Sequence, residues 1–167
     1  MIDTGLLDDR KVELLRGEII EMSPEGVAHS SYCRETGKYL RRLLGDRADI
    51  SEAHPIILPN NSEPEPDIAV VKVSPTLYRD RHPQVSDIFW LIEVSNSTLI
   101  KDLGMKKDIY ADAGILEYWV MNLQESVLIV FRDLTESGYQ SENRFNSGTI
   151  SPLAVPDLSI DVQRLFA

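Results

Sequence analysis

The spacing of hydrophobic positions along the chain predicts strands and helices in a definite order. Two short runs that mix apolar and acidic residues, within Val12–Met22, flank Arg16 and Gly17. They predict a β-hairpin, because glycine can adopt the positive φ that a tight turn needs. Apolar residues then recur at three- and four-residue steps from about Ser30 to Leu44, which predicts a helix with one buried stripe that ends at Gly45.

Short apolar runs predict six further strands. They are Glu52–Leu58, Ile68–Val73, Ile88–Val94, Glu117–Leu123, Val127–Arg132 and Tyr139–Phe145. Pro55 favours an edge position for the first of them, and the last is also expected at an edge. The almost wholly apolar Ile88–Val94 is typical of a central strand covered on both faces. A helix that starts at about Ile100 or Asp102 and ends at Ala113 should connect it to Glu117–Leu123 as a right-handed parallel crossover.

This order predicts an α/β fold with a mixed central β-sheet flanked by helices and an N-terminal β-hairpin. With 167 residues, of which 43% are hydrophobic, the chain should form a single domain, residues 1–167. It has no apolar run of the roughly 20 residues that would span a membrane. The N-terminal MIDTGLLDDRK also lacks the features of a signal peptide. We therefore expect a cytoplasmic protein without a membrane partner.

Two charged residues stand where an ordinary core would have none. Glu93 interrupts the central strand, and Lys106 lies in the helix that follows. At about 100° per residue, the apolar positions of this helix centre near 20° when Asp102 is set at zero, and Lys106 lies near 40°. Lys107, near 140°, lies at the margin. A buried lysine needs a partner, because removing water from an ammonium group is costly, and Glu93 is the nearby candidate.

Asp67 indicates that this pair is more than structural. It immediately precedes Ile68–Val73, and if that strand is antiparallel to Ile88–Val94, Asp67 should lie beside Glu93. Two converging carboxylates repel each other unless a cation lies between them, and oxygen ligands favour Mg²⁺, with Mn²⁺ as an alternative. Lys106 would then assist the attacking water. The competing interpretation is a structural Glu93–Lys106 ion pair in which the lysine extends toward solvent.

Other kinds of site find little support. The three histidines, His29, His54 and His82, lack metal-site spacing, so zinc catalysis is not predicted. Cys33 is the only cysteine, which excludes an internal disulfide, and it is interpreted as a small buried helix residue.

Several segments resemble the Uma-two family of restriction-endonuclease-like proteins, within the PD-(D/E)XK nuclease superfamily. The segments are LLRGEIIEMSPEGVAHS, PEPDIAVVK, LIEVSNST, the D-x3-K-x3-Y-x3-G pattern from Asp102 to Gly114, EYWVMNL and VPDLSIDVQRLF. The resemblance implies a restriction-endonuclease-like core, a Mg²⁺-dependent endodeoxyribonuclease activity on DNA, and Asp67 and Glu93 as metal ligands. The superfamily motif would place lysine at position 95, where this chain has Ser95, and Lys106 matches the position to which the lysine has moved in related families. Glu18 and His29 match accessory positions of the family.

The formal net charge of −10 opposes a broad DNA-binding surface, because binding to the phosphate backbone depends largely on Lys and Arg. Two hypotheses therefore follow from the sequence. One is a metal-dependent hydrolase that cleaves phosphodiester bonds in DNA, with Asp67, Glu93 and Lys106 as its catalytic residues. The alternative is an inactive homodimer with the nuclease fold that binds a partner protein. A homodimer is compatible with both hypotheses.

Overall fold

The computed structural model describes residues 10–167, and its centre is a six-stranded sheet in the order β3-β4-β5-β6-β7-β8. The strands are β3 (Asp49–Glu52), β4 (Ile68–Val71), β5 (Ile88–Ser95), β6 (Tyr118–Asn122), β7 (Val127–Thr135) and β8 (Gly138–Phe145). Strands β5 and β6 are parallel, and every other neighbouring pair in this sheet is antiparallel. The predicted mixed sheet and the parallel crossover between its central strands are therefore confirmed.

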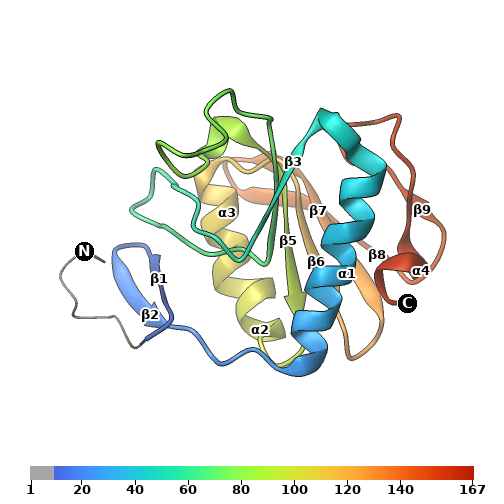
Figure 1. The fold of residues 1–167 in the computed structure, drawn as a ribbon. Coiled ribbons are helices and arrows are strands. Elements are labelled where there is room, and N and C mark those ends of the chain that lie inside the picture. The colour runs from blue at the N-terminus through green and yellow to red at the C-terminus, as the bar shows by residue number, and fades with distance from the viewer. Residues whose placement is uncertain (1–9) are drawn as a thin grey trace.

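Helices cover both faces of the sheet (Figure 1). Helix α1 (Val27–Leu44) lies on one face, near the short C-terminal helix α4 (Val162–Leu165), and a small ladder of β9 (Thr149–Ile150) and β10 (Ile160–Asp161) accompanies them. The other face carries the connection from β5 to β6, a continuous helix of three parts: α2 (Leu99–Lys101), a π-helical segment (Asp102–Lys106) and α3 (Lys107–Ala113). Short 3-10 helices at Gly45–Arg47 and Val85–Asp87 complete the secondary structure of the described residues.

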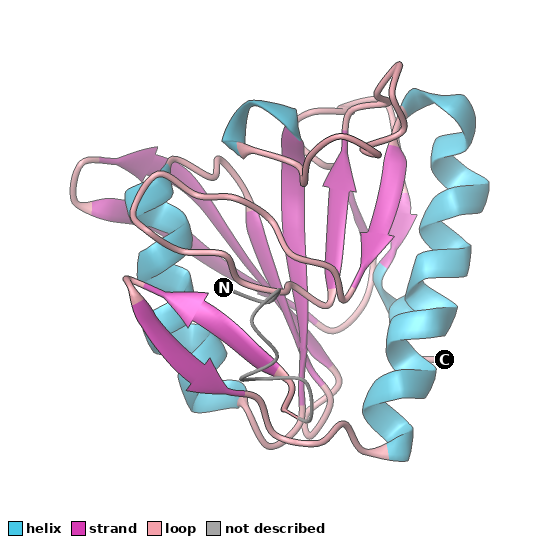
Figure 2. Cartoon of the chain, turned by 60° about the vertical axis from the view of Figure 1, so that its left-hand side comes forward, coloured by secondary structure: helices cyan, strands magenta, loops and turns pink. Residues whose placement is uncertain are grey.

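The predicted N-terminal hairpin is present as β1 (Val12–Leu15) and β2 (Glu18–Glu21). Arg16 and Gly17 both have positive φ, at 50° and 82°, which is the backbone that a two-residue hairpin turn requires. The hairpin stands apart from the main sheet, on the side of α2 and α3 (Figure 2). The backbone of Leu14 and Glu63 exchanges two hydrogen bonds, which ties the hairpin to the loop before β4.

Strand alternation divides the buried residues into two cores. Trp90, Ile92 and Val94 pack with α1 on one face. Leu91 packs on the opposite face with Ile109 and Tyr110 of α3. Glu93 follows Leu91 at a spacing of two, so its side chain points to the face that carries α3.

One predicted strand was wrong in position. The apolar run within Glu52–Leu58 suggested a strand there, but β3 spans the preceding Asp49–Glu52 and the apolar residues lie in an irregular connection. Ile56 and Leu58 are nevertheless buried, with 0% and 4% exposure. They join the α3-side core from this connection, where only isolated bridges form, so burial here reflects tertiary packing and not strand pairing. The edge position predicted for this strand holds for β3.

No helix among residues 10–167 is long and apolar enough to cross a membrane. The prediction that a signal peptide is absent concerns mainly residues 1–9, which lie outside the described residues.

Candidate functional site

The predicted site residues converge where β4 begins and β5 ends. Ile68 of β4 pairs with Ile92 of β5, so Asp67, one residue before β4, lies beside Glu93. The two residues are linked through the backbone: the N–H of Asp67 donates to Glu93 Oε2 at 3.3 Å, and the N–H of Val94 donates to Asp67 Oδ2 at 2.7 Å. The antiparallel pairing predicted for these strands therefore brings the two carboxyl groups together.

Lys106 extends from the helix toward Glu93. Its Nζ donates to Glu93 Oε1 at 2.9 Å and lies 3.2 Å from Glu13 Oε2. Lys106 is only 4% exposed, in agreement with its predicted place inside the apolar face. Tyr110, one turn later, also donates from its hydroxyl to Glu93 Oε1, at 2.7 Å. Glu93 is therefore held by two donors from one helix, which fixes the orientation of its carboxylate.

The helix carrying Lys106 departs from α-helical geometry at this point. The segment Asp102–Lys106 is π-helical, a form that is rare and often occurs at functional sites. Asp102 and Lys106, at its two ends, are both buried, whereas Met105 between them is 39% exposed. The regular helix assumed from the sequence placed Met105 in the apolar face. The structure corrects this: Met105 lines the cavity described below.

Three polar residues that the sequence did not single out as site residues complete the surroundings. Glu13 of the hairpin is 2% exposed and contacts both Lys106 and Lys101, the latter at 2.5 Å. Asp102 accepts hydrogen bonds from the hydroxyls of Ser95 and Thr98, at 2.6 and 2.7 Å. Ser95, which stands where the superfamily motif has lysine, therefore orients an acidic residue of the following helix.

A signal for Glu13 and Asp102 was present in the sequence. Glu13 and Leu15 alternate along one strand, so a carboxylate shares the buried face of the hairpin with a core leucine. Asp102 lies only about 20° from the centre of the predicted apolar face on the same helical construction that located Lys106.

The accessory residues have different positions. His29, in the first turns of α1, brings its Nε2 to 3.1 Å from Asp67 Oδ2. Glu18 is exposed on β2 and lies outside the residues that line the cavity. The structure thus joins His29, but not Glu18, to the group formed by Asp67, Glu93 and Lys106.

These side chains line a cavity of about 220 Å³ between the hairpin, the start of α1 and the π-helical segment. Seven acidic residues contribute to its wall, but only two lysines and one histidine. The acidic residues are Glu13, Glu21, Glu25, Glu65, Asp67, Glu93 and Asp102, and the basic ones are Lys101, Lys106 and His29. The cavity therefore has an excess of negative charge, which a bound cation would reduce.

The two central carboxyl groups have opposite pKa shifts. Burial raises the pKa of Glu93 well above its ordinary value; Lys106 opposes this shift, and the nearby Asp67 adds to it. Burial would also raise the pKa of Asp67, but the hydrogen bond and charge of His29 hold this pKa below its ordinary value. In the protein without metal, Asp67 is ionised and Glu93 resists ionisation. A cation shared by the two groups would remove that resistance.

The charges of Lys106 and His29 are stabilised by these acids. Burial would lower the pKa of Lys106, but Glu93 and Glu13 outweigh it and raise the pKa, so the lysine stays protonated. The hydrogen bond to Asp67 raises the pKa of His29 above its ordinary value, against the opposing effect of burial. Glu13 has a lowered pKa because Lys106 and Lys101 together outweigh the effect of its burial.

The donor set fits a hard divalent cation. Asp67 and Glu93 offer carboxylate oxygens that face the same cavity, and oxygen ligands are those preferred by Mg²⁺ and Mn²⁺. Lys106 lies on the opposite side of the Glu93 carboxylate from Asp67, in the sense that it binds Oε1 while the Asp67 backbone binds Oε2. This arrangement can hold a cation, orient a nucleophilic water and offset charge that develops on a phosphate.

Comparison with known proteins agrees with this site. The model of the Uma2 family, described as "Putative restriction endonuclease", matches residues 5–163. A solved structure with a similar fold is that of a "putative nuclease belonging to DUF820" from Anabaena variabilis. It shares 16% sequence identity with this chain, has a TM-score of 0.70, and the match covers 95% of this chain and 90% of the other. No curated protein matches significantly.

Proposed function

Because the chain belongs to the Uma2 family, whose model covers residues 5–163, we propose that it is a metal-dependent endonuclease that hydrolyses phosphodiester bonds in DNA. The observation that carries this proposal is the convergence of Asp67, Glu93 and Lys106 in one acidic cavity. The family match confirms the resemblance noted from the sequence, and the mixed sheet with its flanking helices agrees with the nuclease structure described above.

Each residue has a defined role in this proposal. Asp67 and Glu93 would hold Mg²⁺, or Mn²⁺, which supplies Lewis-acid polarisation of the phosphate and lowers the pKa of a bound water. Lys106, protonated and in contact with Glu93, orients the attacking water or offsets the charge on the phosphate. Tyr110 and Glu13 are positioning residues, because Tyr110 fixes the Glu93 carboxylate and Glu13 fixes the Lys106 ammonium.

A purely structural Glu93–Lys106 ion pair explains less of the geometry. Such a pair needs only one acid and one base, whereas here Lys106 contacts two carboxylates and Asp67 lies against the same Glu93. Burying this many acids lowers stability unless they are compensated. A cost of this kind is expected where function requires it.

The inactive, partner-binding alternative is supported by the net charge of −10. It differs from our proposal in a measurable way, because an inactive member has no need to bind a divalent cation at Asp67 and Glu93. Metal binding and DNA cleavage therefore separate the two hypotheses.

We expect purified protein to cut supercoiled plasmid DNA in the presence of Mg²⁺ or Mn²⁺ and to stop when EDTA is added. Asp67→Asn should abolish cutting, because it removes the charge of one proposed ligand. Agarose electrophoresis of the plasmid provides the measurement. Linear product formed directly from supercoiled DNA would indicate coordinated cutting of both strands and would support a homodimer.

A matched control is available one residue from the proposed catalytic lysine. Lys107 is partly exposed, with its Nζ 5.5 Å from the centre of the Phe131 ring, and does not line the cavity. Lys107→Ala should leave cutting unchanged. Cutting that survives EDTA, or that survives Asp67→Asn, would contradict the proposal.

A further inference from the structure

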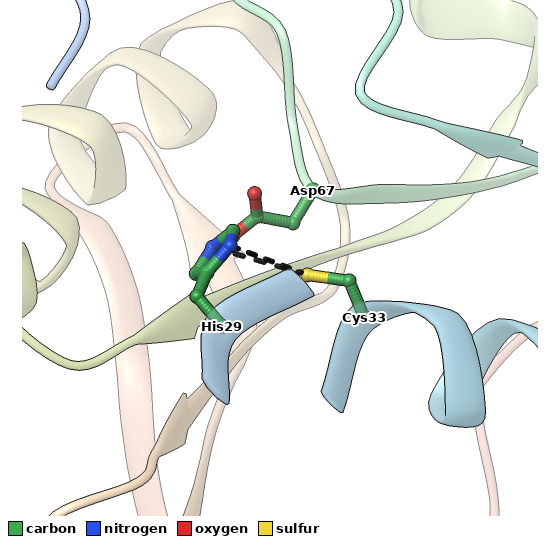
Figure 3. A group of neighbouring side chains, drawn as sticks. All are labelled: His29, Cys33 and Asp67. Atoms are coloured by element: carbon green, nitrogen blue, oxygen red, sulfur yellow. Dashed lines mark hydrogen bonds and ion pairs between the residues drawn. The ribbon is translucent and has the colours of Figure 1, made fainter. Parts of the chain in front are cut away.

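A second group of ligand atoms lies next to the proposed magnesium site and includes the only thiol of the chain. His29 and Cys33 are four residues apart on α1, so they lie on the same side of the helix. Asp67 approaches them from the start of β4 (Figure 3). One ligand atom from each of the three side chains lies within 4.8 Å of the other two.

The separations approach those of a coordination sphere. Cys33 Sγ lies 3.8 Å from each ring nitrogen of His29, and His29 Nε2 lies 3.1 Å from Asp67 Oδ2. In a tetrahedral zinc site with ordinary bond lengths, a sulfur and a nitrogen ligand lie about 3.5 Å apart, and nitrogen and oxygen ligands about 3.3 Å apart. Small side-chain adjustments would bring the three atoms to these distances.

The chemistry of this group differs from that of the neighbouring carboxylates. Thiolate and imidazole are preferred by zinc and other borderline or soft metals, whereas Mg²⁺ binds oxygen ligands. Burial raises the pKa of the Cys33 thiol far above its ordinary value, which makes Cys33 a poor nucleophile. A metal ion bound to sulfur would favour the thiolate directly.

We propose that His29, Cys33 and Asp67 form a binding site for Zn²⁺, separate from the Asp67–Glu93 site for Mg²⁺ but sharing Asp67 with it. Three protein ligands leave a fourth position open, which water can occupy. Since one carboxylate serves both sites, Zn²⁺ and Mg²⁺ compete for it. On the proposed nuclease function, which this consequence presupposes, Zn²⁺ acts as an inhibitor.

Cobalt titration tests the site without any measurement of activity. Co²⁺ replaces Zn²⁺ in such sites, and a bound thiolate gives it an intense charge-transfer absorption in the near ultraviolet. Because Cys33 is the only cysteine, such a band in the untagged protein identifies its ligand. We expect one equivalent of Co²⁺ to produce the band and one equivalent of Zn²⁺ to remove it.

Three variants make the assignment specific. Cys33→Ser should eliminate the band, and His29→Gln should weaken Co²⁺ binding by roughly 100-fold, since a site of three protein ligands loses one of them. Glu93→Gln should leave the band in place, because Glu93 does not belong to this group. Circular dichroism establishes that each variant remains folded.

The absence of a charge-transfer band in the wild-type protein at millimolar Co²⁺ would overturn the proposal. A band that His29→Gln leaves undiminished would also overturn it. These outcomes are independent of DNA cleavage: the band can appear in a protein that does not cut DNA, and a nuclease that requires Mg²⁺ can lack the band. If both proposals hold, Zn²⁺ should inhibit wild-type cutting, and excess Mg²⁺ should relieve the inhibition.

Discussion

Replacing Lys106 by alanine should lower the free energy of unfolding by about 3–5 kcal/mol, because it leaves two buried carboxylates without their cation. Lys106 contacts both Glu93 and Glu13, which are each 2% exposed. Urea denaturation at neutral pH, in EDTA, measures the change. The loss should become smaller as the pH is lowered, since protonated Glu93 and Glu13 no longer require a counter-charge.

Lys107→Ala is the control for this stability measurement as well. Lys107 contributes a cation–π contact with Phe131, so its replacement should cost about 1 kcal/mol or less. A double variant, Lys106→Met with Glu93→Gln, should recover part of the stability lost in Lys106→Ala, because it removes one uncompensated charge and restores packing. Equal effects of Lys106→Ala and Lys107→Ala would show that Lys106 does not compensate the buried acids.

Glu93→Gln should reduce metal-dependent DNA cleavage by at least about 10³-fold, equivalent to about 4 kcal/mol in the activation free energy. Glutamine removes the negative charge that holds the cation but keeps an oxygen that can accept hydrogen bonds from Lys106 and Tyr110. The fold should therefore survive, and initial rates of plasmid cutting should show the loss.

Glu18→Gln provides the comparison for that experiment. Glu18 is an exposed glutamate on the hairpin and does not line the cavity, so its replacement should leave the rate unchanged. If Glu18→Gln reduces cutting as strongly as Glu93→Gln does, the catalytic centre has been assigned to the wrong place.

The central part of the fold could be predicted from local sequence because pattern and packing agree there. The apolar run around Glu93 is long enough to identify a central strand, and strand β5 spans Ile88–Ser95. The helix that follows has a buried face whose only lysine is Lys106, so a regular helical construction was sufficient to place it, although the actual backbone is π-helical. Asp67 could be placed beside Glu93 because the register of neighbouring strands controls which residues lie together.

What the sequence did not predict depends on packing between distant segments. Glu13 reaches Lys106 only because the hairpin packs over the helix of the β5–β6 connection, a contact 93 residues apart in the chain that no local periodicity encodes. The predicted strand Glu52–Leu58 failed for a related reason, since Ile56 and Leu58 are buried by tertiary contacts and not by strand pairing. The proximity of Cys33 to Asp67 likewise requires α1 to pack against the end of the sheet.

The central claim is that Asp67 and Glu93 together hold a divalent cation, and counting free Mn²⁺ by electron paramagnetic resonance tests it most directly. Wild-type protein should remove Mn²⁺ from solution in a saturable manner with one site per chain. Glu93→Gln should weaken this binding by roughly 100-fold, because one of the two ligand charges is lost, while Glu18→Gln should bind as the wild type does. Absence of binding at millimolar Mn²⁺, or equal binding by wild type and Glu93→Gln, would contradict the claim.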